Sequence, residues 1–417
     1  MGAEPRRMLD NVELILVSDV GAPSTQPHAR HVAGRRVTIT DPAREYEACR
    51  QEIDEAIARV LQSGRYVLEE ELLAFEGEFA AYIGRRFAVG VSSGTAALKL
   101  ALLAAGLEPG SEVITTPNSD SSASTAVTHA GLAVVWADID PRTFNLSPTA
   151  LEAKISPRTR AVIPVHLFGQ PAAMDEILTV ARRNDLLVVE DAATATGALY
   201  HGTKAGNFGD LACFSFAPSK PLGGVGDGGM VVTDDPDFDR RLRILRNYGH
   251  VDHGNTNYRD PLGAGEWQVV LQGFNERLDS LYAAILRAKL RTLEGRLEAR
   301  CRIAASYDEA FSSLSNVQVP YQVPDTRHVY YAYNILVGDQ DRFRRGLAAR
   351  GVASRLYYAP PLHLQPAFQY LDQRPGAFPA AEDVGVHMVG LPVFPLMSDA
   401  EVAQVISAVG SLSASRR

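Results

Sequence analysis

The stretch AMDEILTVARRNDLLVVED, residues 173–191, combines the two local patterns that decide the fold. Residues 173–182 are typical of a helix, and the apolar run at 186–189 is typical of a strand buried on both faces. A helix that leads directly into such a strand is the repeating unit of an α/β protein with a mostly parallel sheet.

The same alternation extends over the first two thirds of the chain. Helices are expected at residues 46–61, 70–82, 95–105 and 148–153, and strands at 87–91, 113–115, 133–135, 161–165, 211–216 and 230–233. We therefore predict a mostly parallel sheet covered by helices on both faces. Such a sheet places its ligand site outside the carboxyl ends of the strands.

The pattern changes near residue 278. The features expected there are a long or broken helical stretch at 278–297, a strand near 331–337 and helices near 343–350 and 400–409. Proline-rich connections join these elements, as in a smaller α/β domain. We divide the chain into an N-terminal extension (1–40), a large domain (41–280) and a small C-terminal domain (281–417).

Composition excludes several classes of protein. The net charge of −8, with both signs interspersed, argues against nucleic-acid binding. The three cysteines, at positions 49, 213 and 301, are far apart, so we expect no disulfide framework and a reducing, cytoplasmic setting. His250 and His253 lack the further ligands of a metal site. No window reaches the roughly 20 apolar residues of a membrane span, and no signal peptide is expected.

Asp191 stands directly after the apolar strand, at its carboxyl end. A carboxylate held there in a partly apolar setting needs a cationic partner. The protonated ring nitrogen of pyridoxal phosphate is one such partner, and the pair strengthens the ring as an electron sink. A helix cap or a structural ion pair would also explain the residue, so its position alone leaves both interpretations open.

Lys220 follows another predicted strand, within FSFAPSKP at residues 214–221, and a glycine-rich run follows it. Proline and glycine on both sides fix the loop and let a ligand approach closely. A lysine there can form a Schiff base and then move a proton, although a solvated loop lysine is commoner. The run also has the spacing GxGxxG, but a strand rather than a helix is expected after it, so we reject a dinucleotide site.

Residues 93–96, Ser-Gly-Thr-Ala, lie between a predicted strand and a predicted helix. The backbone amides at a helix N-terminus are free and attract phosphate. Every strand–helix junction offers something similar, so the motif alone is a weak sign of a phosphate site.

Five segments in order carry a resemblance to a known family. They are SGTAAL (93–98), EDAA (190–193), FSFAPSK (214–220), GDGG (226–229) and GFNERLD (273–279). Each is weak, but the ordered set, which extends from about Ile39 to the C-terminus, is specific. It resembles the DegT/DnrJ/StrS family of sugar aminotransferases. The resemblance implies the fold type I architecture of pyridoxal-phosphate enzymes and a homodimer with active sites at the interface.

The resemblance also implies roles for individual residues. Lys220 matches the Schiff-base lysine and Asp191 the carboxylate on the pyridine nitrogen, so these two are the expected catalytic residues. Asn275 matches a residue that reaches the phosphate of the neighbouring subunit. The residues implied to bind the cofactor are Gly94, Thr95, Ala96, Asp191, Thr194, Ser215, Lys220 and Asn275.

Four positions depart from the family pattern, and one of them is Glu69, which stands where a glycine is usual. After Pro117 the family usually has an aromatic residue that stacks on the cofactor ring, and our alignment puts Ser121 there. Thr194 and Thr196 stand where Gln and His are common. The shorter Thr194 would hold the ring oxygen only through a shifted cofactor or a water.

The expected function is pyridoxal-phosphate-dependent transfer of an amino group from an amino acid, L-glutamate or L-glutamine, to a keto sugar, nucleotide-linked, or to a cyclitol. The departures motivate one alternative, a different reaction of the same cofactor, such as elimination. A non-catalytic regulatory relative is the other alternative, and the presence of both Lys220 and Asp191 counts against it. Tyr357, Tyr358 and His363 are candidates for the substrate site.

Overall fold

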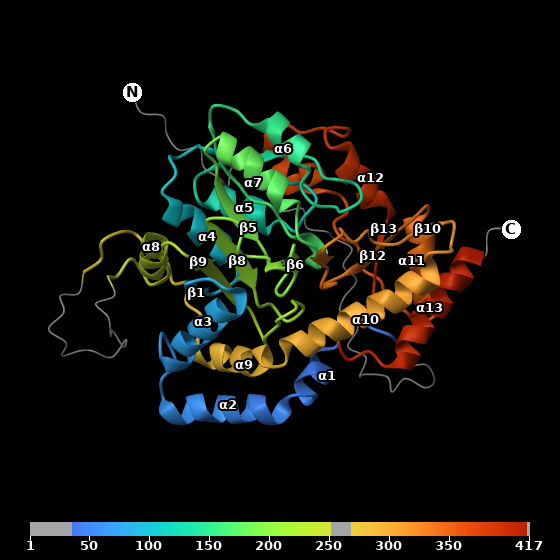
Figure 1. Cartoon of the computed structure of the whole chain (residues 1–417), viewed down its shortest axis with the longest axis horizontal. Coiled ribbons are helices and arrows are strands. Elements are labelled where there is room, and N and C mark those ends of the chain that lie inside the picture. The colour runs from blue at the N-terminus through green and yellow to red at the C-terminus, as the bar shows by residue number, and fades with distance from the viewer. Residues whose placement is uncertain (1–35, 252–267, 415–417) are drawn as a thin grey trace, which may run out of the picture. The chain divides into compact units, whose positions relative to one another are not determined.

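The computed structural model describes residues 36–251 and 268–414. Its main sheet has seven strands in the order β1-β9-β8-β5-β4-β2-β3 (Figure 1). These strands are β1 Phe87–Val91, β2 Glu112–Thr115, β3 Ala133–Trp136, β4 Thr159–Val162, β5 Leu187–Asp191, β8 Leu211–Ser215 and β9 Gly229–Thr233. β9 runs antiparallel to both of its neighbours, and the other pairs are parallel. The prediction of a mostly parallel sheet is confirmed.

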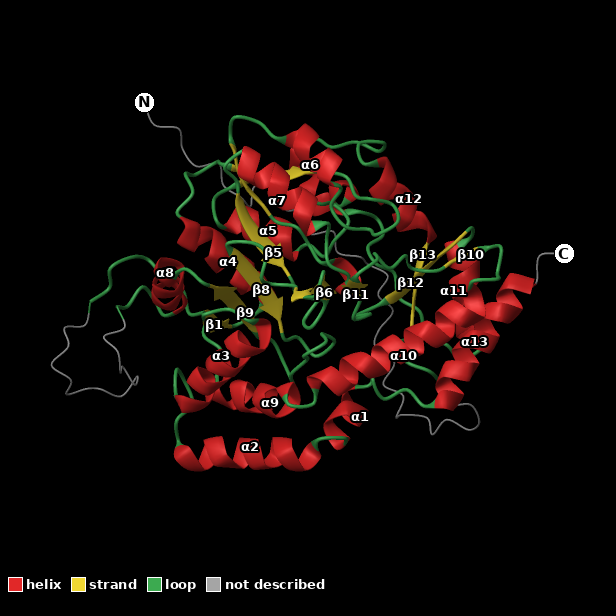
Figure 2. Cartoon of the chain, in the orientation of Figure 1, coloured by secondary structure: helices red, strands yellow, loops and turns green. Residues whose placement is uncertain are grey.

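Helices cover both faces of this sheet (Figure 2). One face packs against α4 Gly94–Ala105, α5 Ser122–His129 and α8 Pro236–Arg246. The other face packs against α3 Glu70–Ile83 and α9 Ser280–Leu290 at one end, and against α6 Pro148–Lys154 and α7 Met174–Arg183 at the other. Because side chains alternate along a strand, Cys213 points into the first layer and its neighbours Ala212 and Phe214 into the second.

The quoted stretch folds as expected. Helix α7 buries Met174, Ile177 and Val180 on one stripe, which is the 3.6-residue period of an amphipathic helix. Acidic residues lie in its first turn and arginines in its last, where each favours the helix dipole. The helix ends at Arg183, and β5 then runs buried through the sheet.

Several boundaries differ from the expectations. The single helix expected at 46–61 is two helices, α1 Pro42–Glu47 and α2 Arg50–Ser63. The long or broken stretch expected at 278–297 is broken into α9 and α10, and α10, which spans Leu293–Phe311, ends well beyond the expected boundary. Helix α8 was not predicted, because its arginine-rich sequence hides a narrow apolar stripe, although Asp235 and Pro236 are a clear helix start.

A smaller antiparallel sheet lies in the C-terminal part, in the order β10-β12-β13. Its elements and those around it are β10 Val317–Gln318, β12 Tyr333–Val337, β13 Met388–Leu391, α11 Gln340–Ala349, α12 Pro379–His387 and α13 Asp399–Ala414. Three short strands, β6 Leu199–Tyr200, β7 Thr203–Lys204 and β11 Thr326–Arg327, form a third sheet. Helices α10, α11 and α13 share one apolar cluster with β12 and β13.

The division of the chain at residue 280 stays a prediction. Helix α9, which begins there, shares a core cluster with α3 and packs on α2 through two smaller clusters, whereas α10 continues to the smaller sheet. Of the expected N-terminal extension, residues 1–35 lie outside the described residues. Val37 is fully buried and pairs with Val352. Within the described residues, no helix has the length and apolarity that a membrane crossing requires.

Candidate active site

A cavity of about 270 Å³ lies where the loops after β1, β2, β4, β5 and β8 meet. Residues from all five of these loops line it. Loops that follow the carboxyl ends of neighbouring strands converge at one edge of a parallel sheet, so the cavity lies where the sequence analysis expected a ligand.

The N-terminus of α4 forms one wall. Ser93 caps the helix, and its Oγ accepts a hydrogen bond from Ala96 N at 3.1 Å. Gly94 and Thr95 line the cavity beside Ser215 from the end of β8. A Cβ on Gly94 would lie 2.8 Å from Ser215 Cβ, so only glycine lets helix and strand approach this closely. The predicted ligand Ala96 is not among the lining residues, and its amide already donates to the Ser93 cap.

Asp191 is the last residue of β5 and lines the cavity, with 7% of its surface exposed. Its Oδ1 accepts one hydrogen bond, from Ala193 N at 3.1 Å. Burial raises the pKa of the Asp191 carboxyl, and the Ala193 N–H and the charge of Lys220 offset this only in part. A cation at this oxygen would stabilise the carboxylate.

The neighbouring Glu190 points to the opposite side and is fully buried. Its carboxylate accepts hydrogen bonds from His166 Nε2 at 2.8 Å and from the backbone N–H groups of Gly206, Phe208 and Gly209. Burial opposes ionisation of Glu190, but these donors outweigh it and lower the pKa.

His166 connects this buried carboxylate to the site. Its Nδ1 accepts from Ala172 N at 3.0 Å, so its proton lies on Nε2, toward Glu190. The backbone of His166 then donates to Asp191 O at 2.9 Å and accepts from the Thr194 hydroxyl at 2.8 Å. Sequence analysis missed this pair, because a lone histidine far from Glu190 in the chain gives no signal.

Lys220 reaches the cavity from the loop after β8. Its Nζ lies 4.9 Å from the centroid of the Tyr331 ring, and Ser219 Oγ lies 3.4 Å from the Tyr331 hydroxyl. The glycine-rich run shapes this loop, since a Cβ on Gly224 would lie 2.2 Å from the Tyr282 hydroxyl. The run leads into strand β9, which confirms that it is not a dinucleotide fingerprint.

Other predicted residues fall into two groups. Thr194 and Tyr358 line the cavity. Asn275 is exposed and its backbone pairs with Asn247, so it lies outside the cavity of its own chain. His363 is buried away from the cavity with its Nε2 3.0 Å from Glu382, and Tyr357 is buried beside Tyr358.

Two of the positions that depart from the family pattern, Ser121 and Thr196, do not line the cavity. Ser119, Asp120 and Ser122 line the cavity, whereas Ser121, which our alignment puts at the ring-stacking position, is not among the lining residues. Asp120 Oδ1 accepts from the backbone N and the hydroxyl of Ser122 at 3.1 and 2.6 Å. Thr196 is fully buried, and its hydroxyl finds no hydrogen-bond partner among the described residues. Sequence analysis also missed Tyr331 and Arg355 in the cavity wall.

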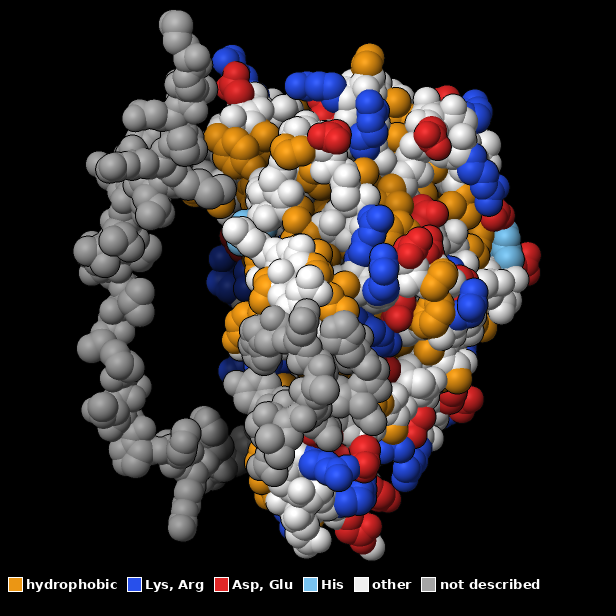
Figure 3. All heavy atoms as spheres, turned by 90° about the vertical axis from the view of Figure 1, so that its left-hand side faces the viewer, with side chains coloured by type: hydrophobic (Ala, Val, Ile, Leu, Met, Phe, Trp, Pro, Cys, Tyr) orange, Lys and Arg blue, Asp and Glu red, His pale blue; other side chains and the backbone are white. Residues whose placement is uncertain are grey.

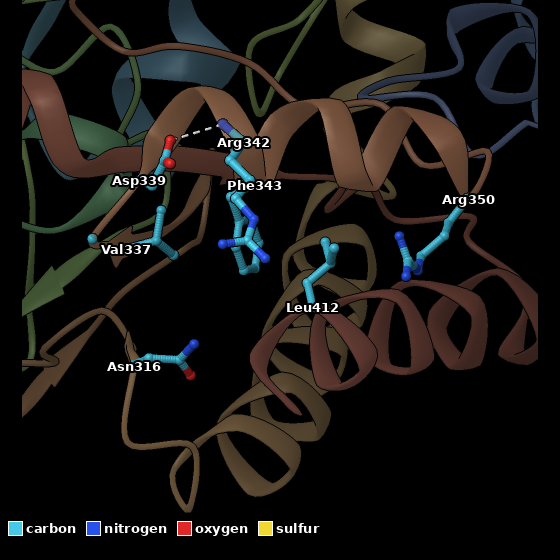
Figure 4. A pocket seen from close by; sticks show the side chains of 8 residues that line it. Asn316, Val337, Asp339, Arg342, Phe343, Arg350 and Leu412 are labelled. Carbon is cyan, nitrogen blue, oxygen red and sulfur yellow. Dashed lines mark hydrogen bonds between the residues drawn. The ribbon is translucent and has the colours of Figure 1, made fainter. Parts of the chain in front are cut away.

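A second hollow, of about 250 Å³, lies between α11 and α13 (Figure 4). Its polar contacts are structural: Asp339 Oδ1 caps α11 by accepting from Arg342 N at 2.9 Å. Among the described residues, no cluster of three histidine, cysteine or acidic side chains has the arrangement of a metal site. The cavity with Lys220 and Asp191 is therefore the candidate active site.

Comparison with known proteins gives consistent matches. The model of the DegT/DnrJ/EryC1/StrS aminotransferase family matches residues 47–410. The dTDP-3-amino-3,4,6-trideoxy-alpha-D-glucose transaminase of Streptomyces venezuelae is 40% identical over 374 residues, 90% of this chain and 95% of that protein. The structure of S. venezuelae DesV in complex with a ketimine intermediate has a TM-score of 0.86 at 40% identity and covers 91% of this chain and 99% of that one. NtdA from Bacillus subtilis with bound cofactor PMP has a TM-score of 0.83 at 27% identity, with 92% and 87% covered.

Proposed function

Because the chain belongs to the DegT/DnrJ/EryC1/StrS aminotransferase family, we propose that it uses pyridoxal phosphate to move an amino group from an amino acid to a nucleotide-linked keto sugar. One observation carries the proposal. Lys220, Asp191 and the N-terminus of α4, which come from three separate strand ends, line the same cavity.

The residues present fit this cofactor. The N–H groups of Gly94 and Thr95 and the Ser215 hydroxyl offer donors to a phosphate group at a helix N-terminus. Among the described residues no cation forms an ion pair with the buried Asp191 carboxylate, and the charge of Lys220 offsets its burial only in part, which suits a protonated ring nitrogen. When bound, pyridoxal phosphate supplies an electron sink that stabilises negative charge on the carbon next to the transferred nitrogen.

Each residue of the chain has a separate task. Lys220 binds the cofactor and then carries the proton, because its Nζ is the amine among the described side chains of the cavity wall. Glu190 and His166 hold the backbone on either side of Asp191, so the carboxylate keeps its direction. The Thr194 hydroxyl donates to His166 O, so toward a ligand it offers lone pairs.

The nature of the molecule that accepts the amino group is inferred from the side chains of the cavity wall and from the relatives of the chain. Ser119, Asp120, Ser122 and Tyr358 give the wall hydroxyl and carboxylate groups that suit a polyhydroxylated ring. The relative from S. venezuelae is named for a dTDP-linked amino sugar. We take L-glutamate or L-glutamine as the donor.

We further propose that the chain works as a homodimer in the cytoplasm. Exposed apolar side chains lie in α2, in α3 and in the segments around residues 248 and 270, and Figure 3 shows apolar patches between charges on that side. Asn275 is exposed in the same region. A second copy placed there would bring Asn275 to the partner's cofactor phosphate, as the family resemblance implies.

The test is a visible absorption spectrum of the purified protein with pyridoxal phosphate, before and after L-glutamate, beside a Lys220→Ala variant. We expect a band that L-glutamate bleaches in the wild type and does not bleach in the variant, with 2-oxoglutarate released in step. A band that no amino donor bleaches would contradict the proposal. Light scattering of the same samples reports the oligomeric state.

A further inference from the structure

The cavity wall contains one arginine that the proposed machinery does not use. Arg355 lines the cavity, and its side chain is exposed. Its guanidinium lies 5.1 Å from the centroid of the Tyr357 ring, within the range of a cation–π contact. In the part of the chain that the structure describes, no carboxylate pairs with it.

The base of this arginine is rigid. Arg355 N donates to Gly390 O at 3.0 Å, and Gly390 N donates to Arg355 O at 2.8 Å. Gly390 belongs to β13, and a Cβ there would lie 2.8 Å from a ring carbon of Tyr357. The glycine therefore lets the buried Tyr357 ring pack against the strand as a platform for the guanidinium. The arrangement holds a cation at the cavity without neutralising it.

The other charged side chains of the cavity wall restrict the kind of ligand that Arg355 can bind. The charged lining residues are Asp120, Asp191, Asp227, Lys220 and Arg355. Asp191 and Lys220 are assigned to the cofactor, whose phosphate is bound by α4 and β8, on separate elements from Arg355. An anionic group of a substrate would be repelled by Asp120 and Asp227. Arg355 is then the cation among the described lining residues that can receive it.

We propose that Arg355 binds the anionic group of the substrate and so determines which substrates the cavity accepts. The ligand is a carboxylate of the amino donor or a phosphoryl group of the nucleotide-linked acceptor, since a planar guanidinium binds either through paired N–H groups. This proposal rests on the proposed function, because it takes the cofactor as bound by the other residues.

The test measures equilibrium binding of two probes to the cofactor-loaded protein. Glutarate carries carboxylates and no phosphate, and thymidine diphosphate carries phosphates and no carboxylate. Both are titrated calorimetrically into the wild type, Arg355→Gln and Arg355→Lys. The control is Arg345→Gln, which removes an exposed arginine on α11 outside the cavity.

We expect Arg355→Gln to weaken the binding of one probe by about 10- to 100-fold, which is the loss expected when a hydrogen bond to a charged group is removed. Arg355→Lys should recover part of this loss, because it keeps the charge and loses the fork geometry. Loss of glutarate binding identifies the donor carboxylate, and loss of thymidine diphosphate binding identifies the acceptor. Arg345→Gln should change neither.

Equal binding of both probes to wild type and Arg355→Gln would overturn the proposal, as would a wild type that binds neither. These outcomes are separate from failure of the proposed function, which appears as a wild type that does not take up pyridoxal phosphate. An unchanged melting temperature and cofactor band in Arg355→Gln show that the variant is folded and loaded.

Discussion

Gly94→Ala tests the phosphate cradle directly. The added Cβ would lie 2.8 Å from Ser215 Cβ and 3.3 Å from its Oγ, and ordinary contact begins at 3.4 Å. Ser215 Cβ is fixed to the backbone of β8, so α4 and β8 must separate. Overpacking of this kind costs about 1–3 kcal/mol. Because both elements carry the donors that we propose for the phosphate, we expect cofactor binding to weaken by about 5- to 150-fold.

The assay is a titration of apoprotein with pyridoxal phosphate, followed by its absorption and paired with urea unfolding. Gly77→Ala, in α3, is the matched control, since its Cβ would meet nothing within 4 Å. That change should leave cofactor binding unaltered and raise the unfolding free energy by about 0.5–1 kcal/mol, as expected for glycine in a helix.

A double-mutant cycle separates the clash from the loss of the Ser215 hydroxyl. Ser215→Ala removes the hydroxyl and keeps the clashing Cβ, whereas Ser215→Gly removes both and leaves the Cα of residue 215 at 3.4 Å, an ordinary contact distance. Gly94→Ala should therefore weaken cofactor binding strongly when combined with Ser215→Ala and only slightly when combined with Ser215→Gly. An equal effect in both backgrounds would refute the packing argument.

Two further predictions concern stability. Glu76→Gln should lower the unfolding free energy, measured in urea, by about 3–5 kcal/mol, because buried Glu76 pairs with Arg246 and Arg243. The control Glu78→Gln, in the same helix, removes a more exposed partner of Arg287 and should lower it by less than about 1 kcal/mol. Hydrogen bonding to Arg44 lowers the pKa of Glu401 to about 2 from an ordinary value of 4.5, so its stabilising effect is present above pH 4.5 and is lost as the pH falls toward 2. The unfolding free energy of Glu401→Gln should depend less on pH over that range than that of the wild type. An equal pH dependence in the two proteins would contradict the role given to Glu401.

The sheet could be predicted because each strand is a separate apolar run and each helix has its own period. Residues at the ends of those runs, such as Asp191 and Lys220, could be placed at one edge for the same reason. Which residues after Pro117 face the cavity could not be predicted, because a loop has no periodic pattern that fixes the direction of its side chains. Arg355 could not be placed at all, since its neighbour Gly390 is distant in the chain and the pairing of short strands leaves no mark in composition.

Glu190 and Asp191 show why a motif does not assign roles by itself. The two carboxylates are adjacent on β5 and therefore point to opposite sides. Glu190 receives hydrogen bonds from His166 and three backbone N–H groups, and its pKa is lowered. Asp191 receives one, from Ala193, and burial raises its pKa. Because proteins rarely leave a buried carboxylate without compensation, this contrast supports our proposal that the partner of Asp191, and not of Glu190, is a bound cation.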